Sequence, residues 1–204
     1  VKSGTIRASD WQGIDAVIHL AGASIAGSRW TAKYKSLLRS SRVDATETLV
    51  RNLRAHRVFP KAFVTASGLG IYPSSGDTVL GEEVQPATDF LGQLARDWER
   101  ASESIQHDGV RWASGRLSMV LDPNAGALVP LLRQWQLFAG GKISDGEMFW
   151  SWIERDDAAS ALLWLALQDS CHGSYNLTGT PVTNAQFAAT LSEVLRRPAW
   201  IPAP

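Results

Sequence analysis

Short apolar runs alternate along this chain with longer segments in which apolar residues recur at helical spacing. The runs have the length of buried strands, and turns that contain Gly, Pro or Asp separate them from the helical segments. We predict strands over residues 16–20, 61–66, 110–121 and 175–177. We predict helices over residues 31–56, 89–101, 126–138, 156–167 and 184–195. Such alternation is typical of βαβ units, so the expected fold is α/β, a doubly wound parallel sheet with helices on both faces.

The segment over residues 15–22, Asp-Ala-Val-Ile-His-Leu-Ala-Gly, is the most informative of the apolar runs. It ends in small residues, as expected for a buried parallel strand that is followed by a tight turn. Ligands of open α/β sheets bind beside the carboxyl ends of such strands. We therefore expect a ligand near Leu20, Ala21 and Gly22. The Gly-rich phosphate-binding turn of a dinucleotide-binding domain does not occur in residues 1–14.

Composition narrows the class of protein. The chain has 204 residues and a formal net charge of +0, which suits one domain with a sizeable core and gives no electrostatic case for a nucleic acid or an anionic membrane as partner. The single cysteine, Cys171, is typical of a reduced, cytoplasmic protein. The longest apolar run, residues 161–167, is too short to cross a bilayer. The four histidines show no ligand spacing, so we expect no metal site.

Several segments, taken in order, resemble an extended short-chain dehydrogenase/reductase. Residues 15–22 match the fourth strand of that superfamily, and residues 65–76 match its fifth strand. The closer resemblance is to its atypical epimerase family, which is nucleoside-diphosphate-sugar epimerase-like and is also called the SulA-type group. The motifs that carry this closer resemblance lie at residues 29–30, 41–49, 94–99, 115–121, 151–157 and 184–198. Together they cover almost the whole chain.

The resemblance implies one NAD(P)-binding Rossmann-type domain over residues 1–204, in which residues from about 139 onward contribute a small, irregular substrate-side lobe. Family members begin with a strand, a Gly-rich turn and a helix. Residues 1–10 instead resemble the segment that follows their second strand. We therefore expect this chain to be an internal part that lacks the first βαβ unit and the C-terminal tail.

The resemblance also implies which residues contact the cofactor. Leu20 and Ala21, with Gly22 in the turn, would line a nicotinamide dinucleotide through main-chain and apolar contacts. Arg42, in the motif that begins at Ser41, would reach the same cofactor, because a guanidinium suits phosphate or ribose oxygens. Without the resemblance, residues 20–22 would be a tight turn and Arg42 a solvated helix residue. The family favours NADP(H), and NAD(H) is the alternative.

The proton-transfer residues of ordinary short-chain dehydrogenases are altered here. Those enzymes use a Ser or Thr with the Tyr and Lys of a YxxxK motif. Phe90 takes the place of the Tyr and Leu94 that of the Lys, and neither can transfer a proton. Phe90 would instead pack near the nicotinamide. Ser67 and Tyr72 remain as candidates for catalysis, although counting from Tyr72 places Gly68 at the usual hydroxyl position, and Ser67 is also a candidate for cofactor or substrate contact.

Charged residues elsewhere have simpler interpretations. Asp156 and Asp157 stand where a helix begins, so we expect them to cap that helix rather than bind a metal. Glu154 occupies a position where family members often carry His. Arg116 lies in an apolar strand and needs a partner if it is buried, so it is either structural or part of the substrate pocket.

Two functions fit these observations. The first is an NAD(P)(H)-binding, epimerase-like oxidoreductase that acts on an unknown small molecule, a carbonyl, carbinol or nucleotide-sugar-like compound. A hydride would move between the substrate and the nicotinamide, and the protein would supply orientation. The alternative is a non-catalytic NADP(H)-binding sensor or regulatory protein, which the loss of the Tyr–Lys pair favours.

Overall fold

A computed structural model describes residues 11–199 of the protein. The chain divides into two compact units. Of the described residues, the first comprises 11–73, 81–116 and 161–175, and the second comprises 74–80, 117–160 and 176–199. Most of the lobe expected from about residue 139 therefore belongs to the second unit, together with residues 117–138. The expectations about residues 1–10 and about the C-terminal tail lie outside the described residues.

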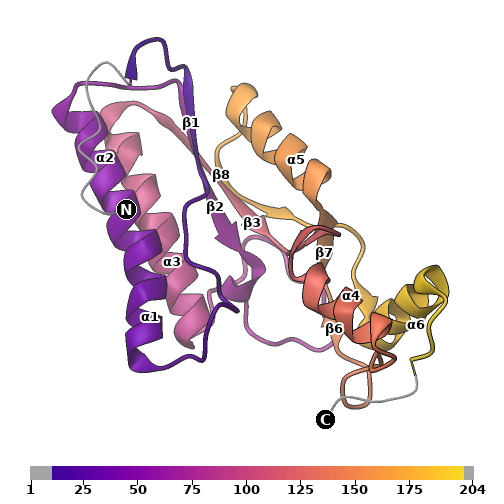
Figure 1. The fold of residues 1–204 in the computed structure, drawn as a ribbon. Coiled ribbons are helices and arrows are strands. Elements are labelled where there is room, and N and C mark those ends of the chain that lie inside the picture. The colour runs from indigo at the N-terminus through magenta and orange to yellow at the C-terminus, as the bar shows by residue number, and fades with distance from the viewer. Residues whose placement is uncertain (1–10, 200–204) are drawn as a thin grey trace. The chain divides into compact units, whose positions relative to one another are not determined.

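The central sheet has the strand order β1-β2-β3-β8 (Figure 1). Its strands are β1 (Ala16–His19), β2 (Ala62–Gly68), β3 (Arg111–Leu117) and β8 (Gly173–Leu177). β1 and β2 are parallel, with Ala16 opposite Ala62 and His19 opposite Thr65. Residues 62–67 of β2 are all buried, as expected for a strand with a helix layer on each face. The predicted α/β class with a parallel sheet is confirmed.

The long helix predicted over residues 31–56 is present, but one turn of it has π geometry. It consists of α1 (Ala32–Arg39), a π-helix (Ser40–Asp44) and α2 (Ala45–Ala55). The side chain of Thr31 caps its start by accepting a hydrogen bond from the Tyr34 backbone N–H. The buried residues Leu38 and Val43 are five positions apart, one more than an α-helical turn would place on the same side. The wider π turn lets both of them face the interior.

Helix α3 (Phe90–Glu103) begins where the sequence predicts, since the Asp89 side chain accepts the Gly92 backbone N–H at 2.8 Å. A 3-10 turn (Leu69–Ile71) follows β2, and another (Ser104–Asp108) follows α3. Figure 1 shows α2 and α3 on the same side of the central sheet. The core of this unit includes Trp11, Val50, Leu53, Phe63, Ile105, Val110 and Trp112.

Helix α5 (Arg155–Leu167) has its C-terminal half in the first unit, on the other side of the central sheet (Figure 1). The Arg111 guanidinium at the start of β3 donates hydrogen bonds to backbone carbonyls of Leu165, Ala166 and Cys171 at 2.7–2.8 Å. These carbonyls belong to the end of α5 and the turn after it, where no intrahelical partner remains. One side chain thus ties the end of the helix to the sheet.

The prediction of one strand over residues 110–121 is wrong. The chain breaks at Ser118, and β4 (Met119–Asp122) joins a separate sheet with β5 (Ala125–Gly126) and β7 (Trp152–Glu154). The Ser118 and Met119 backbone N–H groups bond to carbonyls of different partner segments, at Leu177 and Ser151. Apolar residues continue on both sides of Ser118, at Leu117 and over residues 119–121, so the sequence carries no local sign of the change of partner.

The second unit also contains β6 (Phe149–Trp150), β9 (Val182–Thr183), α4 (Leu128–Gln136) and α6 (Asn184–Leu195). Thr183 and Gln186 form a capping box at the start of α6. Asp156 and Asp157 lie inside the first turn of α5 rather than before it, so the expected cap is misplaced. Their charges still complement the positive end of the helix dipole there.

Candidate functional site

The loop that follows β1 lies against the π-helix. Residues 20–22 are exposed, at the carboxyl end of the strand. The Arg42 guanidinium packs closely over Gly22, since a Cβ built there would lie 2.9 Å from the Cζ of Arg42 and would displace the guanidinium. The backbone N–H of Ala23 donates to the Oγ of Ser41 at 3.0 Å. The structure therefore brings together the predicted residues 20–22 and Arg42, which lie far apart in the sequence.

Arg42 is a partly buried cation without an acidic partner in the described residues. Its guanidinium lies over the ring of Trp98, with the Cζ 5.1 Å from the ring centroid, and its Nη1 donates a long hydrogen bond of 3.5 Å to the Leu38 carbonyl oxygen. Burial lowers the pKa of Arg42 below its ordinary value. Among residues 11–199, no carboxylate forms an ion pair with it. A guanidinium that has lost part of its hydration and has gained no counter-charge favours an anion beside it.

The hydroxyl of Thr46 connects three elements around this site. Thr46 is fully buried. Its Oγ1 donates to the Arg42 carbonyl oxygen at 2.6 Å, accepts from the Trp98 Nε1–H at 3.0 Å, and lies 2.9 Å from the Nε2 of His19. The hydroxyl has one hydrogen, which the Arg42 carbonyl takes, so His19 must be the donor in the third bond. His19 therefore carries its proton on Nε2.

A neutral His19 agrees with its surroundings. The side chain lies at the end of β1 and is 8% exposed. Burial lowers the pKa of His19 below its ordinary value, because the imidazolium would be less well solvated than the neutral ring. The neutral Nε2–H tautomer is thus the form that burial of the ring favours and the form that can donate to Thr46.

An aromatic cluster surrounds the start of α3. The rings of Trp30 and Phe90 meet edge to face with centroids 5.7 Å apart, and the Nζ of Lys35 lies 5.0 Å from the Phe90 centroid. Leu94, one turn further along α3, is 4% exposed and packs in the interior. The positions that align with the Tyr and Lys of YxxxK are therefore an apolar ring at the helix start and a core leucine.

Ser67 lies at the carboxyl end of β2 and is buried. Its Oγ has no hydrogen-bond partner within the described part of the chain. Buried hydroxyl groups are normally paired, because an unpaired one loses its hydration without compensation. The Ser67 hydroxyl is therefore an unsatisfied polar group at the carboxyl end of β2.

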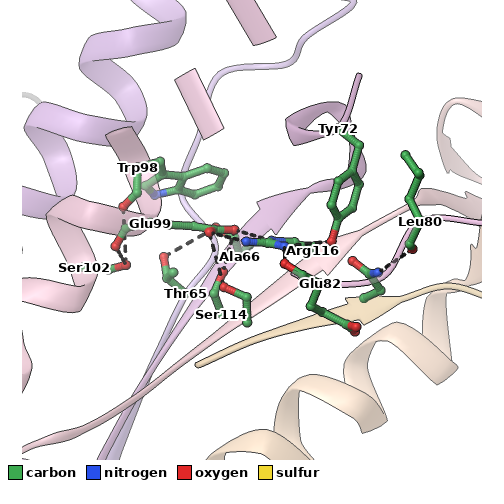
Figure 2. Close-up of polar contacts among 12 residues, drawn as sticks. Thr65, Ala66, Tyr72, Leu80, Glu82, Trp98, Glu99, Ser102, Ser114 and Arg116 are labelled. Atoms are coloured by element: carbon green, nitrogen blue, oxygen red, sulfur yellow. Dashed lines mark hydrogen bonds and ion pairs between the residues drawn. The ribbon is translucent and has the colours of Figure 1, made fainter. Parts of the chain in front are cut away.

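Tyr72 is held by a buried ion pair. Its hydroxyl accepts a hydrogen bond from Nη1 of Arg116 at 2.7 Å, and Arg116 makes a two-pronged pair with the Glu99 carboxylate, both bonds 2.9 Å long (Figure 2). Burial alone would lower the pKa of Arg116, but the hydrogen bonds and charge of Glu99, with a smaller effect of Tyr72, raise it overall. Arg116 has the partner that its place in an apolar strand requires.

Sequence reasoning did not single out Glu99, although it is the partner of Arg116. Its carboxylate also accepts from the hydroxyls of Ser114 and Ser174, at 3.3 and 3.2 Å. Glu99 faces inward among the apolar positions of α3, one residue after Trp98, and this is the pattern that could have marked it. Glu99 and Arg116 also line a pocket of about 320 Å³, so Arg116 is both structural and part of a pocket wall.

The described residues also bear on metal binding and on membrane insertion. No three residues among the His, Cys, Asp and Glu of residues 11–199 are grouped so that they could hold a metal ion. No helix in the same range combines the length and the apolar character needed to cross a bilayer.

Comparison with known proteins relates this chain to one family. A model of the NAD dependent epimerase/dehydratase family matches residues 2–178. An epimerase family protein of Mycobacterium leprae is 35% identical over 198 residues, which make up 97% of this chain and 64% of that protein. The crystal structure of human epimerase family protein SDR39U1 (isoform 2) with NADPH has a TM-score of 0.88 at 31% identity, over 93% of this chain and 65% of that one.

A nucleoside-diphosphate sugar epimerase from Corynebacterium glutamicum is also similar in structure, with a TM-score of 0.79 at 28% identity. That match covers 96% of this chain and 42% of the Corynebacterium chain. The chain thus spans just under two thirds of the Mycobacterium leprae relative and of the human structure. The structural likeness confirms the predicted Rossmann-type fold.

Replacing Thr46 should destabilise the first unit. Thr46→Val keeps the shape of the side chain but leaves the N–H donors of His19 and Trp98 without their acceptor, while the Arg42 carbonyl keeps its bond from the Ala45 backbone N–H. We expect the free energy of unfolding in urea to fall by about 2–4 kcal/mol. Thr48→Val is the matched control, because Thr48 is exposed on the same helix and its hydroxyl bonds, among residues 11–199, only back to the Asp44 carbonyl. Equal effects of the two substitutions would contradict the role given to Thr46.

His19 should make stability depend on pH. Its pKa is lowered in the folded state, so the unfolded chain takes up a proton first as the pH falls below about 6.5. Stability from neutral His19 is present above that pH and is lost below it, by at most about 1.4 kcal/mol per pH unit. Urea unfolding at a series of pH values should show this loss for the natural protein and for His107→Gln, an exposed control, but not for His19→Gln.

Proposed function

Because this chain belongs to the NAD dependent epimerase/dehydratase family, we propose that it binds a nicotinamide dinucleotide beside the carboxyl end of β1 and acts as an epimerase-like oxidoreductase. The observation that supports this most is the Arg42 guanidinium, which packs against Gly22 without a carboxylate partner in the described residues. The bound nicotinamide would supply the hydride transfer, and the protein would bind and orient the reactants.

The residues around Arg42 fit such a cofactor. The loop over residues 20–22 is exposed and has no Cβ at Gly22, so a ligand can approach its backbone closely. Arg42 would bind a phosphate or ribose oxygen with the charge that no described carboxylate neutralises. Phe90, at the start of α3, would offer a flat apolar face to the nicotinamide ring.

We propose NADP(H) as the preferred cofactor, with NAD(H) as the alternative. Support comes from the human epimerase family protein, which is 31% identical and whose structure holds NADPH. The substrate would be a small molecule with a carbonyl or carbinol carbon, or a nucleotide-sugar-like compound. Ser67 would bind a substrate or cofactor oxygen through its unpaired hydroxyl, and Tyr72 would be the remaining phenol able to exchange a proton.

Arg42→Gln should weaken cofactor binding strongly. A charge-assisted hydrogen bond to a phosphate contributes about 1.5–3 kcal/mol, so the Kd for NADPH should rise by roughly ten- to a hundredfold. The measurement is a fluorescence titration of the full natural protein with NADPH. Arg51→Gln is the matched control, because Arg51 is exposed on the same helical segment. An unchanged Kd for Arg42→Gln would overturn this assignment.

A second function has its own support. Leu94 is buried in the core and Phe90 has no ionisable group, so the Tyr–Lys pair of ordinary short-chain dehydrogenases has no counterpart at these positions. The Tyr72 hydroxyl is already bound by Arg116. A protein that binds NADP(H) and reports its level without transferring a hydride would need neither a Tyr–Lys pair nor a Tyr72 hydroxyl available for proton transfer.

The two functions differ in the step after cofactor binding. The oxidoreductase should consume the absorbance of NADPH when a panel of ketones, aldehydes and sugar nucleotides is added, and Ser67→Ala and Tyr72→Phe should slow that loss by about tenfold or more. Arg51→Gln should leave the rate unchanged. NADPH binding without consumption across the panel would favour the sensor and would refute the proposed catalytic roles of Ser67 and Tyr72.

A further inference from the structure

The loop between β1 and α1 has no regular structure, and side chains of the following helix hold it in place. The Ser41 Oγ accepts the Ala23 backbone N–H at 3.0 Å. The Tyr34 hydroxyl donates to the Ser24 carbonyl oxygen. Residues 24–31 of the loop make two backbone hydrogen bonds, from Gly27 to Ser24 and from Thr31 to Arg29, and the side-chain contacts of Ser41 and Tyr34 fix the segment before them.

Ser41 differs from an ordinary serine inside a helix. Such a serine bonds back to a carbonyl three or four residues earlier, as Ser40 does with Leu37 at 3.2 Å. Ser41 makes the same backward bond, to the Leu38 carbonyl oxygen at 3.1 Å, and in addition accepts the Ala23 N–H. Its one hydrogen points along the helix, and a lone pair is left to bind the loop.

The π-helix explains how Ser41 and Arg42 can both face the loop. Successive side chains on an α-helix point in directions far apart around the axis. The wider π turn over Ser40–Asp44 reduces that angle, so one residue can bond to Ala23 while the next packs against Gly22. Helical turns of this kind occur frequently at functional sites.

We propose that Ser41 is a positioning residue for the phosphate-bearing part of a dinucleotide. Its hydroxyl holds residues 20–23 against the π turn, and this places the backbone at Gly22 beside the Arg42 guanidinium. Ser41 acts through the loop and does not itself touch the ligand. This inference rests on the proposed function, because it takes Arg42 as the group that binds the anion.

The test compares Ser41→Ala with Ser40→Ala in the full natural protein. The two serines are neighbours in the same π turn, and both make the backward bond, but the bond to Ala23 belongs to Ser41. The first measurement, without cofactor, is the hydrogen-exchange rate of the Ala23 amide by NMR. We expect Ser41→Ala to speed this exchange by about tenfold and Ser40→Ala to leave it unchanged.

The second measurement is the Kd for NADPH by fluorescence titration. Ser41→Ala should raise it by about fivefold, with a thermal midpoint equal to that of Ser40→Ala. The positioning role would be overturned if the Ala23 amide in Ser41→Ala exchanged no faster than in the natural protein. Equal NADPH affinity of the two variants would overturn it as well. If the natural protein binds no NADPH, the proposed function fails on its own, and the exchange rates still show whether Ser41 holds the loop.

Discussion

The candidate site depends on one buried hydroxyl group. Thr46 donates to the Arg42 carbonyl and accepts from Trp98 and His19, so a single oxygen joins the π-helix, α3 and the end of β1. Every bonding position of that hydroxyl is used. Because these groups lie in the interior, none of them has water as an alternative partner, and the arrangement of the elements is correspondingly specific.

A second buried polar centre lies on the same helix, α3, and has a different physical character. The Glu99–Arg116 pair brings two charges out of water, which is costly unless further hydrogen bonds complete the pairing. Ser114 and the Tyr72 hydroxyl supply two of those bonds (Figure 2). The Ser174 hydroxyl supplies another. Two adjacent residues of helix α3 thus serve the two centres. Trp98 donates a hydrogen bond to the Thr46 hydroxyl, and Glu99 forms the ion pair with Arg116.

Two other polar groups of the first unit lack a full set of partners within the described residues. Arg42 keeps a charge without a carboxylate, and Ser67 keeps a buried hydroxyl without a hydrogen bond. Tyr72, by contrast, is bonded to Arg116. Arg42 packs against Gly22 in the loop after β1, and Ser67 lies at the carboxyl end of β2. Open α/β sheets bind their ligands beside such strand ends. This is the physical basis for proposing a dinucleotide there.

Local patterns in the sequence were sufficient for most of the elements, including the caps at Thr31 and Asp89 and the loop after β1, because helix starts and buried strands depend on neighbouring residues. The resemblance to a family then named residues 20–22 and Arg42 as one site. The break at Ser118, the π turn and the partners of Thr46 and Arg116 were decided only by the tertiary structure. The π turn depends on how Leu38 and Val43 pack in the interior. The break and the partners depend on hydrogen bonds between residues far apart in the chain, and no local pattern records which distant group a buried donor will find.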